Sequence, residues 1–195
     1  GASDVYKRQV LYHAQGILEE MGLENEVELL AARVHGSRSR EGLYRDDSDL
    51  DVVLSYRGNI REDIFFNELN AHGMAVAGIK VDINPIAEER ITLAEYMKES
   101  EAYLDRKEIE KLAIDLDNFS YEHDTYEYKD TVENRDEQVE KIKEDILNQK
   151  TGGLKEWLAE ILEESDVDSD AITARSLLSR LKNTETLSIF SRHPE

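Results

Sequence analysis

Two strand-like runs in the first third of the chain, residues 28–35 and 50–56, constrain its fold more than any other feature. Asp49 and Asp51 stand two positions apart where the second run begins, so on an extended backbone both carboxylates leave the same face. Apolar side chains alternate with them and can be buried on the other face: Leu50, Val52 and Leu54. We therefore expect a strand with one face in a hydrophobic core and two carboxylates on the other.

A Gly-Ser pair follows the first run directly. Gly36 has no Cβ, so the backbone at this position can approach an anion closely. Ser37 would begin a helix, where free N–H groups and the helix dipole favour a phosphate. A third carboxylate, Asp82, is carried by another strand-like run at residues 75–84, which we expect Pro85 to end after a possible hairpin at Gly78.

These side chains together suit metal-assisted transfer from a nucleoside triphosphate. Carboxylates this close suit Mg²⁺, with Mn²⁺ as a substitute, because Mg²⁺ keeps several waters and takes its other ligands from carboxylates and phosphates. Asp82 would share the metal or act as the base for an attacking hydroxyl. Two bridging metals would stabilise both the entering and the leaving oxygen of an in-line displacement.

The pattern resembles the signature of the nucleotidyltransferase superfamily, which includes DNA polymerase beta, kanamycin nucleotidyltransferase and the minimal nucleotidyltransferases. That signature is a hydrophobic strand, Gly-Ser, a spacer of about ten residues, Asp-hydrophobic-Asp and a later third Asp. The spacer here, residues 38–48, is one residue longer, and the extra residue falls in a turn at 41–44. The resemblance covers residues 10–100. It implies metal and catalytic roles for Asp49, Asp51 and Asp82, and phosphate binding by Gly36 and Ser37.

Four arginines surround the Gly-Ser pair: Arg33, Arg38, Arg40 and Arg45. We predict that Arg38 and Arg40 bind the triphosphate and position its pyrophosphate leaving group. The alternative is that these arginines balance the acidic side chains that follow them, Asp46, Asp47 and Asp49.

Composition limits the partners. The formal net charge is −20, which disfavours an extended nucleic-acid interface because an acidic surface repels polynucleotides. There is no cysteine, so disulfides and thiolate metal sites are excluded. No apolar run reaches membrane length, and we expect a cytoplasmic protein of undetermined oligomeric state.

The predicted fold class is α+β: a small mixed sheet with packed helices, the nucleotidyltransferase fold, followed by an all-helical C-terminal segment. We expect a leader at residues 1–9, a core at 10–115, an acidic linker at 116–131 and the helical segment at 132–195. The leader is set apart because Asp4–Gln9 can be back-translated to a transposon-end adapter used in sequencing libraries.

Helical patterns cover residues 10–22 and 61–72, and Thr92 caps a helix that a second acidic helix follows to about 115. In the C-terminal segment we expect helices at 132–149, at 154–164 and from 168 onward, packed on one another or serving as a docking element.

Three hypotheses on function remain open. The first is an enzyme that transfers a nucleoside monophosphate, AMP in the first instance, from ATP or another nucleoside triphosphate to a hydroxyl of a protein, an RNA or a small molecule. The second is an acidic inhibitor from a mobile element that mimics DNA and binds a host defence protein, such as a CRISPR or restriction component. The third is a fragment whose function needs further domains. The intact carboxylates favour the enzyme, and the net charge favours the inhibitor.

Overall fold

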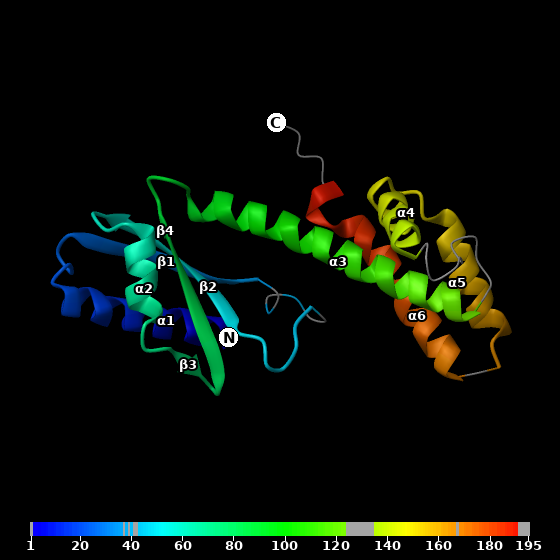
Figure 1. The fold of residues 1–195 in the computed structure, drawn as a ribbon, viewed down its shortest axis with the longest axis horizontal. Helices are drawn as coiled ribbons and strands as arrows, with labels where there is room; N and C mark the ends of the chain where they lie inside the picture. The colour runs from blue at the N-terminus through cyan, green and yellow to red at the C-terminus, as the bar shows by residue number, and fades with distance from the viewer. Residues whose placement is uncertain are drawn as a thin grey trace. The chain divides into compact units, whose positions relative to one another are not determined.

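The structure is a computed structural model that describes residues 2–36, 38, 40, 43–123, 135–166 and 168–190. The chain divides into two units, residues 1–104 and residues 105–195, which are described separately (Figure 1). Among the described residues, no helix is both long and apolar enough to cross a membrane.

A mixed sheet forms the framework of the first unit, in the order β1 (Val27–His35), β2 (Leu50–Gly58), β4 (Ile79–Ala87) and β3 (Ala75–Val76). β1 pairs antiparallel with β2, whereas β2 pairs parallel with β4. The parallel pair needs a crossover, which contains α2 (Glu62–Asn70). The α+β class and the mixed sheet are confirmed, and β1 and β2 lie where residues 28–35 and 50–56 were predicted to form strands.

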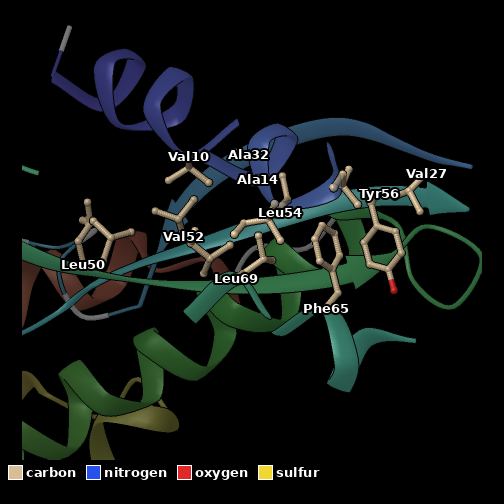
Figure 2. Close-up of a cluster of buried hydrophobic side chains, with 14 of the residues drawn as sticks. Val10, Ala14, Val27, Ala32, Leu50, Val52, Leu54, Tyr56, Phe65 and Leu69 are labelled. Carbon is tan, nitrogen blue, oxygen red and sulfur yellow. The ribbon is translucent and has the colours of Figure 1, made fainter. Parts of the chain in front are cut away.

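One face of the sheet is buried against α1 (Ala2–Met21) and α2. Every second residue of β2 and β4 points into this core, as the alternation in the sequence predicts. Tyr56 meets Phe65 edge to face at 5.1 Å, and the Tyr56 hydroxyl donates to the Ile60 carbonyl at 2.6 Å. Figure 2 shows part of this cluster, which includes Val10, Ala14, Val52, Leu54, Tyr56, Phe65, Leu69, Val81 and Ile83. The opposite face of the same strands is therefore the one that carries Asp51 and Asp82.

The strand predicted at 75–84 is two strands joined by the expected hairpin. Ala77 and Gly78 have φ angles of 52° and 80°, and two positive φ angles are typical of the tight turns that join such strands. The predicted end at Pro85 is wrong, because β4 continues through Pro85 to Ala87.

The outer edge of β4 explains why the strand tolerates proline. The N–H groups of alternate residues point away from β2 and are taken by groups other than a neighbouring strand: Val81 donates to the Met74 carbonyl at 2.8 Å, Ile83 to Asn70 Oδ1 at 3.0 Å and Ala87 to Glu62 Oε2 at 2.7 Å. Residue 85 belongs to the same alternating series. Proline has no N–H to satisfy there, so it costs the edge of the sheet nothing.

α3 (Leu93–His123) begins in the first unit and continues into the second as one helix of 31 residues. The sequence had predicted two helices here. Its start follows the predicted cap, since Glu95 N–H donates to Thr92 Oγ1 at 3.2 Å. Residues 116–123, predicted as linker, are helical instead, because Leu116 and Phe119 are buried in a core. Residues 124–131 of that predicted linker lie outside the described residues.

The predicted C-terminal helices are present as α4 (Arg135–Leu147), α5 (Gly152–Glu164) and α6 (Asp168–Asn183), followed by two 3₁₀ turns, η3 (Thr184–Thr186) and η4 (Ser188–Phe190). They share a hydrophobic core with the C-terminal part of α3, in which Phe119 packs on Trp157 at 5.6 Å. Buried Asp117 accepts from Arg135 Nε at 2.8 Å and joins α4 to α3. The second unit, including the C-terminal part of α3, therefore has a hydrophobic core distinct from that of the first unit.

Replacing Asn70 with alanine tests the edge of β4. Asn70 both donates to the Ile83 carbonyl at 2.9 Å and accepts from the Ile83 N–H, so the substitution leaves two backbone groups unpaired. We expect Asn70→Ala to lower the free energy of unfolding by about 1–3 kcal/mol in urea denaturation. Exposed Asn67, on the same helix, is the matched control, and an equal loss in Asn67→Ala would contradict this account.

Candidate functional site

Three polar side chains from three separate segments stand in one row across the sheet. His35 of β1 pairs with Asp51 of β2, and Asp51 pairs with Asp82 of β4. Asp49 precedes β2 by one residue and shares the face of Asp51. The structure thus brings together the three carboxylates that the sequence predicted as a group, and adds His35 beside them.

Gly36 lies directly against this row. Its φ angle is +75°, and a Cβ built on it would lie 2.5 Å from Asp51 Oδ2. The Asp51 carboxylate therefore fills the space that a side chain at position 36 would need. This reason for a glycine could not be seen in the sequence. Ser37 lies outside the described residues, as do residues 39, 41 and 42 of the helix expected to begin there. Arg38 lies in a 3₁₀ turn, and residues 43–49 are turn and irregular chain.

The carboxylates perturb one another. Burial, and then the charge of Asp49, raise the pKa of Asp51. Burial, a hydrogen bond with the Asp49 side chain and the Asp49 charge raise the pKa of Asp82, which the Lys80 ammonium partly offsets. Negative charge is concentrated here beyond what the nearby protein groups neutralise, so a bound cation would be stabilised.

Lys80 is a site residue that the sequence reading missed. Its Nζ lies 3.8 Å from Asp49 Oδ2 and 3.8 Å from Asp82 Oδ1. The signal for it was present, because Lys80 is two residues before Asp82 and so shares its face of β4.

A second missed group borders the row beside His35. Tyr96 of α3 meets the His35 ring edge to face at 5.4 Å, and its hydroxyl accepts a hydrogen bond from Asn84 Nδ2 at 3.0 Å. Burial lowers the pKa of His35, so its imidazole stays neutral at neutral pH. Asn84 could have been found by its spacing from Asp82, but no sequence pattern linked Tyr96 to His35.

The two arginines predicted to bind nucleotide have their guanidinium groups bound to backbone carbonyls. Arg38 donates from Nε to the Ser48 carbonyl at 2.6 Å and from a terminal nitrogen to the Asp46 carbonyl at 2.8 Å, and it stacks over Tyr44. Arg40 donates to the Glu101 carbonyl at 3.2 Å. In this structure Arg38 organises the turn that leads into Asp49, and phosphate binding by either arginine stays a prediction.

The donor set fits Mg²⁺ as an open site. Among the described residues, no three His, Cys, Asp or Glu side chains are arranged so that they could hold a metal together. Mg²⁺ does not require such a cage, because it is commonly held by one or two carboxylates with waters and substrate phosphates completing its shell. The Lys80 ammonium lies 3.8 Å from both Asp49 and Asp82, so a positive charge already stands beside these two carboxylates.

Comparison with known proteins gives no relative: no protein-family model, no curated protein and no solved structure matches this chain. The interpretation of the site therefore depends on its own geometry.

Replacing Gly36 with alanine tests whether the Asp51 carboxylate packs against Gly36, if the cost of the positive φ angle is measured separately. Gly73 has a similar φ angle of +68° but open space where its Cβ would lie, so Gly73→Ala measures the cost of the backbone conformation alone, about 1–2 kcal/mol. Gly36→Ala must in addition displace the Asp51 carboxylate, and we expect a further loss of about 1–3 kcal/mol in urea denaturation. Equal losses in the two variants would show that Asp51 does not pack on Gly36.

Replacing Asp51 with asparagine tests the crowding of charge. A carboxyl whose pKa is raised by folding binds protons more strongly in the folded state, so its contribution to stability is lost as pH rises through the folded pKa. We expect Asp51→Asn to be at least as stable as the parent chain at neutral pH, and to lose this advantage below the ordinary pKa of aspartate.

Urea denaturation over a pH series would measure this difference. Asp117→Asn is the contrasting control, because Asp117 is buried with Arg135 as its partner and its replacement should destabilise the chain at neutral pH. A similar destabilisation by Asp51→Asn would contradict the proposed crowding.

Proposed function

We propose that the chain is a Mg²⁺-dependent nucleotidyltransferase that moves a nucleoside monophosphate, AMP in the first instance, from a nucleoside triphosphate to a hydroxyl group. The acceptor would be a protein, an RNA or a small molecule. The observation that carries the proposal is the alignment of Asp51 and Asp82 on adjacent parallel strands, with Asp49 on the same face and the Gly36 backbone against Asp51. Four residues that were predicted to act together, Asp49, Asp51, Asp82 and Gly36, thus lie close together on the sheet.

Each residue has a chemical task in this reaction. Asp49, Asp51 and Asp82 would hold Mg²⁺, which would supply Lewis-acid stabilisation of the phosphate oxygens. Asp82 would also accept the proton of the acceptor hydroxyl while that oxygen forms its bond to the α-phosphorus and the bond to pyrophosphate breaks.

The neighbouring groups would orient the substrates. The Gly36 backbone and Ser37 are the predicted partners for the donor phosphates, while the space that a side chain at Gly36 would need is filled by the Asp51 carboxylate. Neutral His35, held against Tyr96, can form a hydrogen bond at the site without adding charge. Arg38 supports catalysis by fixing the turn before Asp49, and Arg40 stays a candidate for the pyrophosphate.

A second candidate function is an acidic inhibitor from a mobile element, acting through its surface on a nucleic-acid-binding host defence protein. The net charge of −20 favours it, since a dense acidic surface can occupy a site made for DNA. This function would need none of the residue alignment described above. We place either activity in the cytoplasm.

Radiolabelled transfer distinguishes the two functions. The protein would be incubated with Mg²⁺ and each nucleoside triphosphate labelled at the α-phosphate, alone and with bacterial lysate. We expect label to reach an acceptor with the parent chain, and transfer to fall at least about 100-fold in the Asp49→Asn/Asp51→Asn double variant.

The matched control is Asp46→Asn/Asp47→Asn, which removes two exposed carboxylates from the adjoining turn. This control should keep transfer activity. Absence of transfer, together with equal binding of a DNA-binding target by both double variants, would favour the acidic inhibitor instead.

A further inference from the structure

One ammonium group joins two of the carboxylates at the proposed site. Lys80 Nζ is equidistant from Asp49 Oδ2 and Asp82 Oδ1, at 3.8 Å from each. The two aspartates come from different segments, the chain before β2 and the middle of β4. Lys80 is therefore a bridge across the parallel strand pair on its polar face.

Stabilisation of the fold does not account for this bridge. The Lys80 side chain is 62% exposed, and the Asp49 and Asp82 side chains are 38% and 41% exposed. Ion pairs this accessible contribute little to folding, because water screens them and the long lysine side chain loses entropy. The three side chains lie instead where the carboxylates of the proposed reaction must act.

A divalent cation shared by Asp49 and Asp82 would lie between the two carboxylates, where the Lys80 ammonium now stands. Mg²⁺ binds carboxylate oxygens at about 2.1 Å, so the bound ion would repel the ammonium from this position. Lysine carries a compact charge on a flexible four-carbon stem, and its exposure leaves it free to swing away. Occupation by Lys80 and occupation by the metal are then mutually exclusive states.

We propose that Lys80 is a regulatory residue of this site: its ammonium holds Asp49 and Asp82 together in the metal-free protein and competes with the divalent cation for them. Lys80 thereby sets the cation concentration at which the site fills. This inference rests on the proposed function, because it takes the carboxylates as the metal ligands. Lys80 would thus control binding of the divalent cation before any reaction with the nucleotide.

Mn²⁺ binding without nucleotide, followed by electron paramagnetic resonance, tests the proposal without recourse to activity. We expect Lys80→Met, which keeps the apolar stem and removes the charge, to bind Mn²⁺ roughly three- to tenfold more tightly than the parent chain. Lys80→Arg keeps the charge and should stay close to the parent affinity.

Arg57→Met is the matched control. Arg57 also bridges two carboxylates on an exposed part of the same unit, at 3.7 Å from Glu28 and 2.6 Å from Glu88. Its removal changes the net charge equally but frees no proposed metal ligand. The proposal requires that Arg57→Met leave the Mn²⁺ affinity unchanged.

A second readout is the rise in melting temperature on adding Mn²⁺. Because a ligand stabilises more strongly the form that binds it more tightly, Mn²⁺ should raise the melting temperature of Lys80→Met above its value in EDTA by more than it raises that of the parent chain. Equal rises in the two chains would overturn the competition between Lys80 and the cation.

The possible failures are distinguishable. If Asp49→Asn/Asp51→Asn abolishes Mn²⁺ binding but Lys80→Met leaves it unchanged or weaker, the regulatory role is overturned and the proposed function stands. A gain in Arg57→Met equal to that in Lys80→Met overturns the role as well, since net charge alone then explains it. Mn²⁺ binding that is insensitive to the aspartates overturns both proposals.

Discussion

The parallel pairing of β2 with β4 is the interaction on which the rest of the first unit depends. Its register places Asp51 opposite Asp82, and a slip of one residue would turn one of these carboxylates into the hydrophobic core. Parallel neighbours cannot be joined by a tight turn, so the chain must cross over through α2. That same helix supplies Asn70 and Glu62 to the outer edge of β4, so the element that makes the topology possible also completes the hydrogen bonds of the strand.

The carboxylates on one face of this sheet are unfavourable for folding, whereas the apolar side chains on the other face stabilise the fold. Side chains such as Leu54, Tyr56 and Ile83 are fully buried against the helices, where each contributes to folding. On the other face, burial and mutual repulsion raise the pKa values of Asp51 and Asp82. Folded proteins keep such unfavourable groupings chiefly where function requires them, which is why the crowded carboxylates are the stronger pointer to chemistry.

The sequence predicted the elements that alternate strongly and missed those that depend on contacts far along the chain. The alternation around Asp49 and Asp51 located β2 and its two faces correctly. Pro85 was taken as the end of a strand, because its tolerance follows from an outer edge that only the folded chain reveals. Residues 116–123 were taken as linker, since their polar composition hid the buried side chains Leu116 and Phe119.

In the candidate site, too, residues that depend on local spacing were predicted, and residues that depend on distant contacts were missed. The three carboxylates and Gly36 were predicted from local spacing, and the structure places them together. The contact between His35 and Tyr96 was not predictable, because one residue ends β1 and the other lies on α3. The occupation of Arg38 by backbone carbonyls was missed for a similar reason: basic residues near acidic ones suggest charge pairing or phosphate binding before they suggest turn formation.

Net charge bears differently on the two functions once the position of Lys80 is considered. A chain of net charge −20 attracts divalent cations over its whole surface, so an acidic patch by itself specifies no metal site. At the proposed site, by contrast, a basic side chain stands between the carboxylates and must be displaced before a cation can share them. A surface that acted only through negative charge would gain nothing from that ammonium, whereas at a site that binds a metal the ammonium would set the cation concentration needed for binding.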